Sequence, residues 1–394
     1  MITTGIIAEY NPFHNGHEYL LSKARSETNA DFLVVVMSGA FVQRGEPAVI
    51  SKKARVEQAL AGGADLVLEL PFDCAMASAQ TFARGGVKIL DACGVVNNLY
   101  FGSECGDIKI LLETAQALLL PEFDVMLKKE LESGKSYPAA RQAVLNEFIG
   151  ERAQVLTEPN NLLGIEYLLA LNYFNSSITA HSVARKGVSH DAINAEGTSV
   201  SAFALRNFIK SGENVDGYTP EPCAEILQRE MRDGRGPVSV DNMERAMLAG
   251  LRKMSPDEFK NIRDVSEGLE YSLHRASLES TDTESIITSV KSKRYTYSRI
   301  RRILMHAYMG LNVPRASESV PGYIRILGMK KSAAPMVKEL RKKAKLPVLQ
   351  RLASERELPE ALLREIKATD IWGCFSPKPI SPGEDFRVFP IITD

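Results

Sequence analysis

Four short apolar runs, separated by stretches with helical spacing, constrain the fold of this chain more than any other feature. The runs are residues 3–8, 32–37, 65–70 and 98–101. The first two are rich in apolar and β-branched residues, which is typical of strands covered on both faces. The intervening helical patterns cover about 17–28, 52–61 and 79–93. This alternation predicts an α/β fold with a Rossmann-like parallel sheet of right-handed βαβ units, whose ligands lie beyond the carboxyl ends of the strands.

The first predicted strand leads into the stretch Asn11-Pro12-Phe13-His14-Asn15-Gly16-His17, and a helical pattern follows at once. A helix N-terminus presents unpaired N–H groups and the positive end of a dipole, so it suits a phosphate group. His14 and His17 add imidazole donors, which can stabilise the charge that develops on an α-phosphate and on departing pyrophosphate. Gly16 lets the backbone approach a phosphate closely. We predict a triphosphate site with His14 and His17 as catalytic residues; a zinc pair and a helix cap are the alternatives.

Several polar residues follow other predicted strands at the same edge of the sheet. Lys52 and Arg55 follow the second strand and could hold a phosphate, or they could form a solvated helix start. Gly102 follows the fourth strand, where it could let a base or ribose lie against the backbone or simply form a turn. Asn160 could contact adenine or ribose, or cap its helix. Arg185 could clamp a phosphate or point into solvent.

The middle of the chain is predicted to carry a helical insertion. Residues 107–150 have an amphipathic helical pattern, and strand signals resume at 153–156 and 178–184. A polar turn around Asn160 and Asn161 separates these two signals and is predicted to supply an asparagine N-cap.

A stretch with Gly217, Pro220 and Pro222 predicts a domain boundary. We expect a nucleotide-binding domain over residues 1–215, followed by a mainly helical, basic domain over residues 216–394. The Pro-rich tail from residue 376 is expected to be loosely ordered or draped over the body of the protein.

The second predicted domain contains a one-sided run of charge, although the whole chain of 394 residues carries a net charge of only −1. Residues 286–345 hold fifteen Lys or Arg residues against two Glu, with tyrosines between them. Lys and Arg displace counterions from a nucleic-acid backbone, and tyrosine stacks on an unpaired base. We predict an RNA-binding surface here, with a solvated face as the alternative. The candidate contacts are Lys293, Arg294, Arg299, Arg301 and Arg302.

The cysteines and the apolar segments favour a cytoplasmic, reduced and soluble protein. The five cysteines form no CxxC pair, which argues against a disulfide framework and against a structural zinc site. We therefore predict no metal ligands. No basic and apolar leader precedes the first predicted strand, and no apolar run reaches the length of a membrane span.

The histidine stretch matches the HxGH pattern of the nucleotidyltransferase superfamily, and further segments narrow the resemblance. These segments are Gly5–His17, Met37–Gly39, Gln43–Ala48, Glu69–Pro71 and Asn160–Tyr167. Together they resemble the bacterial tRNA(Met) cytidine acetate ligases. The resemblance implies an ATP site made by Ile7, Ala8, Glu9, Tyr10, Asn11, Pro12, Phe13, His14, Asn15, Gly16, His17, Glu18, Tyr19, Leu20, Gly102, Asn160 and Arg185.

The resemblance also implies a reaction. ATP and acetate would give acetyl-adenylate and pyrophosphate, with Mg²⁺ expected on the phosphates. The acetyl group would then pass to the wobble cytidine of elongator tRNA(Met), giving N(4)-acetylcytidine, without acetyl-CoA. The protein would thus have acetate, ATP and this tRNA as partners, and no membrane partner.

Two segments depart from the family pattern. Ser51-Lys52-Lys53 stands where the family has Asp-Lys-Trp, so we assign Ser51 no catalytic role but retain Lys52 as a candidate. Residues 201–206 resemble the second superfamily signature, I-S-S-T-x-I-R, with Ala202 and Phe203 replacing a hydroxyl and the Thr. Arg206 remains in place and is the fourth catalytic candidate.

Two other functions fit part of the sequence. A nucleotidyltransferase that adenylylates a small phosphorylated metabolite would use the same histidines, but it would need little beyond the sheet domain. A non-catalytic RNA-binding protein would use the basic region, but it would have no need of both histidines.

Overall fold

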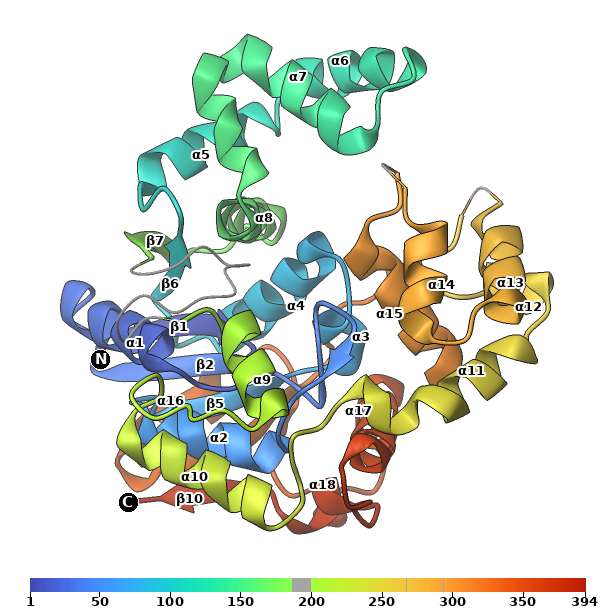
Figure 1. The fold of residues 1–394 in the computed structure, drawn as a ribbon. Coiled ribbons are helices and arrows are strands. Elements are labelled where there is room, and N and C mark those ends of the chain that lie inside the picture. The colour runs from blue at the N-terminus through green and yellow to red at the C-terminus, as the bar shows by residue number, and fades with distance from the viewer. Residues whose placement is uncertain (186–199, 267, 293) are drawn as a thin grey trace.

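The computed structural model describes residues 1–185, 200–266, 268–292 and 294–394. An eight-stranded sheet forms its centre, and seven of the strands run in the order β10-β8-β5-β2-β1-β6-β7 (Figure 1). β9 pairs with β8 off this path. The strands are β1 (Thr3–Ala8), β2 (Phe32–Ser38), β5 (Leu66–Leu70), β6 (Asn98–Ser103), β7 (Thr179–Ala184), β8 (Ile324–Lys330), β9 (Val348–Leu349) and β10 (Ile391–Thr393).

The five strands that the first half of the chain contributes to this sheet are all parallel, as the alternating pattern predicts. Four of them correspond to the four apolar runs, and β7 corresponds to the strand signal at 178–184. Their carboxyl ends therefore meet at one edge of the sheet, which is the edge where the candidate site residues were predicted.

Helices cover both faces of the sheet because successive strand residues point to opposite sides. Val34 and Val36 of β2 pack with α4 and α8 on one face, whereas Val35 packs with α1 and α2 on the other. The helices are α1 (Asn15–Glu27), α2 (Lys52–Ala61), α4 (Ala79–Ala92) and α8 (Pro159–Tyr173).

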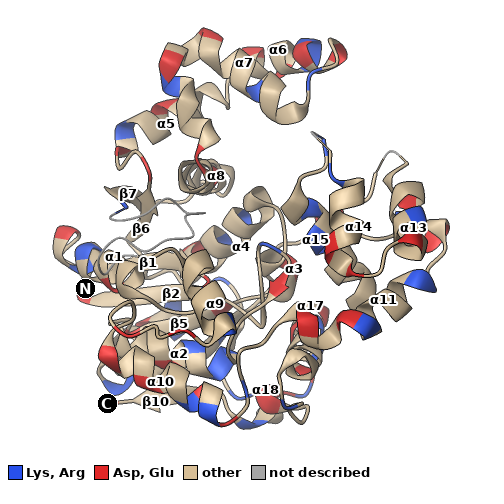
Figure 2. Ribbon diagram, viewed as in Figure 1, with Lys and Arg blue, Asp and Glu red and all other residues tan. Residues whose placement is uncertain are grey.

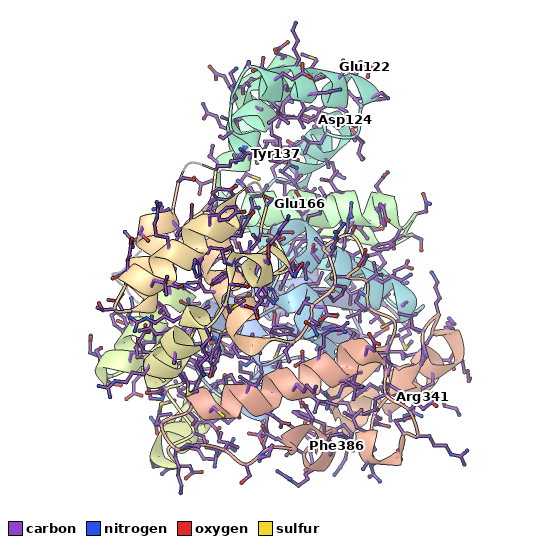
Figure 3. The ribbon with its side chains drawn as sticks, turned by 90° about the vertical axis from the view of Figure 1, so that its right-hand side faces the viewer. Glu122, Asp124, Tyr137, Glu166, Arg341 and Phe386 are labelled. Atoms are coloured by element: carbon purple, nitrogen blue, oxygen red, sulfur yellow. The ribbon has the colours of Figure 1, made fainter. Side chains whose placement is uncertain are left out.

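A helical insertion follows β6, as predicted. It contains α5 (Ile108–Ala117), α6 (Pro121–Glu132) and α7 (Tyr137–Ile149), and it rises above the body of the protein, where Figure 3 labels Glu122, Asp124 and Tyr137. The strand predicted at 153–156 is wrong: residues Gly150–Thr157 form a 3-10 helix. Ala153 and Val155 are buried there against neighbouring helices, so their apolar character reflects helix packing.

The second half of the chain begins with helices and then returns to the sheet. Five of these helices build a core of their own around Leu273, Ile286 and Ile303. They are α11 (Glu244–Arg252), α12 (Pro256–Lys260), α13 (Leu269–Glu279), α14 (Thr283–Val290) and α15 (Tyr297–Met309). The other helices of this half that concern the site or the sheet are α9 (Ala202–Ser211), α10 (Glu221–Arg232), α16 (Ala334–Lys343), α17 (Glu360–Trp372) and α18 (Glu384–Arg387).

The sheet crosses the boundary predicted near residue 215. β8 pairs antiparallel with β5, and β10 pairs parallel with β8, so the last third of the chain supplies strands to the same sheet. Residues 1–215 and 216–394 are therefore not two independent units. The tail beyond residue 376 is draped over the body rather than loose, because Asp385 is buried and β10 is a sheet strand.

Candidate active site

The two histidines lie at the start of α1, beyond the carboxyl end of β1. His14 is the N-cap residue, and its Nδ1 accepts a hydrogen bond from the Gly16 N–H at 3.0 Å. His17 Nδ1 accepts one from the His14 N–H at 3.2 Å, and the two rings stack with centroids 3.8 Å apart. A neutral imidazole that accepts at Nδ1 carries its proton on Nε2. The capping interactions therefore fix both rings as Nε2–H donors, so the capping and phosphate-binding interpretations are compatible.

The surroundings of His17 keep it neutral. Burial, together with the proximity of His14 and of the Arg185 guanidinium, holds the pKa of His17 well below its usual range. Its ring also contacts the rings of Tyr10 and Phe13, with centroids 4.8 and 5.5 Å away. His17 is therefore an oriented neutral donor at pH 7.

The loop that leads into α1 is held rigidly from both sides. Asn11 Oδ1 accepts from the Val49 N–H at 2.7 Å, and the Phe13 N–H donates to Gln58 Oε1 at 3.3 Å. The side chains of Tyr10 and Phe13 are almost completely buried. Parts of the predicted ATP segment thus build and fix the loop, and these two side chains point into the core.

Gly102, Asn160 and Arg185 converge at the ends of β6 and β7, as the sequence predicted. A Cβ placed on Gly102 would lie 3.1 Å from Arg185 Cγ and 3.9 Å from Leu20 Cδ1, so Gly102 leaves room for both side chains. Arg185 Nη1 donates to Asn160 Oδ1 at 3.0 Å. Arg185 also lowers the pKa of His17, so it lies near that ring. Gly102, Asn160, Arg185 and His17 therefore belong to one site.

Glu104 is a residue of this site that the sequence analysis missed. Its carboxylate accepts from the backbone N–H groups of Asn160 and Asn161 at 3.2 and 2.7 Å, and from Asn160 Nδ2 at 2.5 Å. The N-cap of α8 is Glu158, with Pro159 in the first turn, so the predicted asparagine N-cap is wrong. Glu104 directly follows β6 in the sequence, and this position is the signal that could have identified it.

Arg206 lies beside the histidine loop. Its Nη1 donates to the carbonyl oxygen of Asn11 at 3.0 Å, and its Nε lies 3.8 Å from Glu46 Oε2. The N-cap of α9 is Ser201, whose hydroxyl accepts from the Ala204 N–H at 3.0 Å. Arg206 therefore positions the loop and borders the site.

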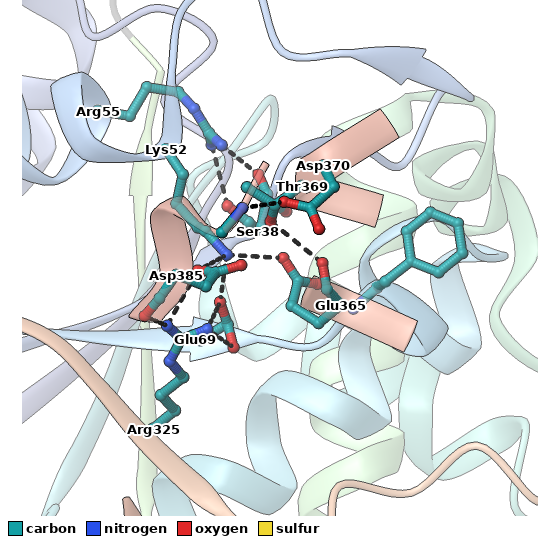
Figure 4. Close-up of polar contacts among 12 residues, drawn as sticks. Ser38, Lys52, Arg55, Glu69, Arg325, Glu365, Thr369, Asp370 and Asp385 are labelled. Carbon is teal, nitrogen blue, oxygen red and sulfur yellow. Dashed lines mark hydrogen bonds and ion pairs between the residues drawn. The ribbon is translucent and has the colours of Figure 1, made fainter. Parts of the chain in front are cut away.

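Lys52 is not part of this site, and the prediction that it clamps a phosphate is wrong. Its ammonium is fully buried and lies 2.8, 3.0 and 2.8 Å from carboxylate oxygens of Glu69, Glu365 and Asp385 (Figure 4). Burial opposes the charged form, yet Asp385, Glu69 and Glu365 together raise the pKa of Lys52. The side chain is fully engaged in joining α2 to the last part of the chain.

Arg55 is also a structural residue. Its Nη1 donates to the carbonyl oxygens of Glu9 and Ser38 at 2.8 and 2.9 Å. It thus joins the backbone at the ends of β1 and β2, and its guanidinium is buried.

Comparison with known proteins places this site in a family. Residues 1–384 match the family described as HIGH Nucleotidyl Transferase. The tRNA(Met) cytidine acetate ligase of Acetivibrio thermocellus is 40% identical over 393 residues, which cover 94% of each chain. That of Thermotoga maritima is 38% identical over 411 residues, which cover 97% of this chain and 98% of the other.

The chain belongs to the tRNA(Met) cytidine acetate ligase family.

Two crystal structures of a family member have the same fold. Thermotoga maritima TmcAL in its apo form I superposes with a TM-score of 0.94 at 36% identity, covering 100% of both chains. The same protein bound with alpha-thio ATP gives a TM-score of 0.93 at 36% identity, again over both whole chains. The described fold is thus that of a tRNA(Met) cytidine acetate ligase along its whole length.

The residues predicted to contact RNA do not form one surface. Arg302 is buried and donates to the Gln43 carbonyl oxygen at 3.1 Å, and burial lowers its pKa to about 10, so its predicted RNA contact is wrong. Arg301 pairs with Glu46, and Arg299 donates to the Asp264 carbonyl oxygen at 2.7 Å. Lys293 lies outside the described residues.

The other basic residues of this region lie on several elements, among them the turn before α15 (Arg294), the loop after it (Arg315), β8 (Arg325, Lys330) and α16 (Lys338, Arg341, Lys342, Lys343). The helices α15 and α16 lie on opposite sides of the molecule (Figure 1), and Figure 2 shows Lys and Arg on α15. Arg294 is exposed in the turn before α15, and Arg341 is exposed on α16. The fifteen basic residues that adjoin in sequence are therefore dispersed by the fold.

Neither a metal site nor a membrane-spanning helix is found among the described residues. In that part of the chain, no His, Cys, Asp and Glu side chains gather in a group of three or more that could hold a metal ion. Within the same residues, no helix has both the length and the apolar character needed to cross a membrane.

Proposed function

We propose that this protein activates acetate with ATP and transfers the acetyl group to the wobble cytidine of elongator tRNA(Met), giving N(4)-acetylcytidine. The observation that carries the proposal is the pair of stacked, capped histidines at the N-terminus of α1, with Arg185, held by Asn160, near enough to lower the pKa of His17. The names of the relatives and the alpha-thio ATP bound to Thermotoga maritima TmcAL support it. We place the protein in the cytoplasm, where its substrates are.

In the first step, a carboxylate oxygen of acetate attacks the α-phosphorus of ATP. The bond from this phosphorus to the bridging oxygen breaks, and pyrophosphate leaves with the electron pair, so no proton has to move. His14 and His17 donate Nε2–H hydrogen bonds to the phosphate oxygens on which charge develops. Arg185, fixed by Asn160, adds a positive charge next to them.

In the second step, the exocyclic nitrogen of cytidine attacks the acetyl carbonyl carbon. The bond from this carbon to the phosphate oxygen breaks, AMP leaves as an anion, and the nitrogen releases one proton to solvent. No acetyl-CoA enters this sequence. A base in an anticodon loop can be unstacked more readily than a base in a duplex, which suits attack by the exocyclic amine.

Mg²⁺ is expected to arrive with ATP, because this ion commonly keeps its waters and binds substrate phosphates with few protein ligands. When bound, it neutralises the charge that develops on the phosphates. The histidines and Arg185 then orient the triphosphate, and the rigid loop from Tyr10 to Phe13 keeps them in place.

Pyrophosphate exchange tests the first step directly. Purified protein is expected to incorporate labelled pyrophosphate into ATP when acetate is present, and not when acetate is omitted. Exchange that requires a phosphorylated metabolite in place of acetate would support the alternative nucleotidyltransferase function and contradict the proposal.

Gly102→Val is expected to weaken ATP binding by about 5- to 150-fold. The added side chain would displace Arg185, and overpacking of this kind costs about 1–3 kcal/mol. Isothermal titration with ATP measures the effect. Gly322→Val is the matched control, because a Cβ at Gly322 meets no atom within 4 Å. Equal affinities for the Gly102 variant and the wild type would remove Arg185 from the ATP site.

Arg294→Ala is expected to weaken tRNA binding and to lower the slope of log affinity against log salt by about 1, because one phosphate contact is lost. Filter binding at several salt concentrations measures this slope. Arg341→Ala on α16 is the control and should leave the slope unchanged. The opposite result would place the RNA on α16 rather than beside α15.

A further inference from the structure

A cavity of about 400 Å³ lies where the helices of the second half meet the catalytic half. The short strand β4 (Glu46–Pro47) and α9 form one side, and α11, α14 and α15 form the other. Apolar side chains, including Val240, Met247 and Leu304, cover part of its wall. The cavity is thus large enough for one nucleoside and offers apolar surface to the faces of a base.

The charge of the cavity excludes ATP as its occupant. Five carboxylate side chains line it, against three basic side chains, those of Arg206, Lys210 and Arg301. A triphosphate would be repelled by this excess of negative charge. A neutral base that carries an amine would not be repelled, because carboxylates accept hydrogen bonds from amines.

Glu46 is the carboxylate best placed to accept from a ligand. Glu244 is already engaged at the start of α14, where it accepts from the Thr283 hydroxyl at 3.0 Å, and Asp241 accepts from the Ser239 hydroxyl at 2.7 Å. Glu46 also pairs with Arg301, but it is the lining carboxylate that contacts Arg206, and its side chain is 22% exposed. Glu46 can accept from the exocyclic amine of cytosine, and a guanidinium beside it can donate to the adjacent ring nitrogen and carbonyl oxygen.

Arg206 connects this cavity to the histidine loop. Its Nε faces Glu46 Oε2 at 3.8 Å, and its Nη1 donates to the Asn11 carbonyl oxygen at 3.0 Å. A single guanidinium therefore separates Glu46 from the loop that carries His14 and His17. A base whose amine approaches Glu46 would lie at the boundary with the predicted site of the adenylate.

From this geometry we propose that the cavity holds the unstacked cytosine that receives the acetyl group, with its exocyclic amine towards Glu46 and Arg206. The inference rests on the proposed function and specifies where the RNA base binds. It assigns Glu46 and Arg301 to positioning the base, in addition to their mutual ion pair.

A variant that fills the cavity tests the proposal. Val240→Trp places a large ring on the wall from a half-buried position. Acetyl transfer to tRNA is expected to fall at least tenfold in kcat/KM, with acetate-dependent pyrophosphate exchange and tRNA affinity within twofold of wild type. Val125→Trp, 72% exposed on α6, is the matched control and should leave all three unchanged.

The other outcomes are equally decisive. Normal acetyl transfer by Val240→Trp would overturn the proposal. A parallel loss of exchange and transfer would also overturn it, because the cavity would then serve adenylation or the fold. If the wild type showed no acetate-dependent exchange, the proposed function would fail first, and the inference would fall with it.

Discussion

Replacing His17 with alanine is expected to lower the rate of acetate-dependent pyrophosphate exchange by about 10²–10³-fold. The structure fixes the His17 ring through Nδ1, so the variant loses an oriented Nε2–H donor, and removing one such donor has an effect of about this size. The affinity for tRNA should remain within about twofold, because His17 lies at the predicted nucleotide site. Exchange kinetics and filter binding on the same preparation give both quantities.

The capping role of His17 adds a small structural effect that has to be separated from the catalytic one. Loss of a helix cap costs about 1 kcal/mol, which a thermal melt would register as a modest decrease in Tm. His274→Ala is the control, since His274 bonds the Met254 carbonyl oxygen in the helical region. A His17→Ala protein with undiminished exchange would remove the histidine from the reaction. If the His17→Ala protein lost both its cooperative thermal unfolding and its tRNA binding, the role of His17 would be purely structural.

Lys52→Met is expected to destabilise the protein by about 3–5 kcal/mol, because it removes one partner from a buried ionic cluster. The buried charges are Lys52 and Arg325 against Glu69, Glu365 and Asp385, so the variant leaves three carboxylates facing one guanidinium (Figure 4). Urea unfolding at pH 8 measures the loss.

The loss should decrease when the pH is lowered. Burial already raises the pKa of Glu365 to about 7, and removal of the ammonium raises it further. A carboxyl group with a raised pKa in the folded state binds its proton more tightly than in the unfolded state, so stability falls as the pH rises from about 4.5 through the folded pKa. Lys53→Met, at a half-exposed neighbouring position, is the control. A Lys52→Met protein as stable as wild type but without exchange activity would restore Lys52 to the catalytic site.

Part of the fold could be predicted because its signals are local. The strands β1, β2, β5 and β6 appear as short apolar runs, and the alternation with helices determines that they are parallel. β8 was missed because Arg325 and Gly328 interrupt its apolar pattern. Arg325 can be buried there only because Glu69 and Asp385, distant in sequence, pair with it at 3.0 and 2.9 Å.

The site residues that could be predicted are likewise those with a local signal, and the wrongly predicted ones depend on partners distant in sequence. Gly102 and Arg185 could be placed because each follows a strand, and the carboxyl ends of parallel strands meet at one edge. Lys52 also follows a strand, but its partner Glu365 lies 313 residues further along, so nothing local indicates that its charge is neutralised. Arg302 was misassigned for a similar reason, since its burial depends on the loop around Gln43.

Transfer of labelled acetate to tRNA tests the central claim most directly. The purified protein is incubated with labelled acetate, ATP and total tRNA, and in parallel with labelled acetyl-CoA in place of acetate and ATP. We predict label in elongator tRNA(Met) as N(4)-acetylcytidine, dependent on ATP and absent with acetyl-CoA. Pyrophosphate release with a phosphorylated metabolite, together with no label in tRNA from acetate and ATP, would contradict the account.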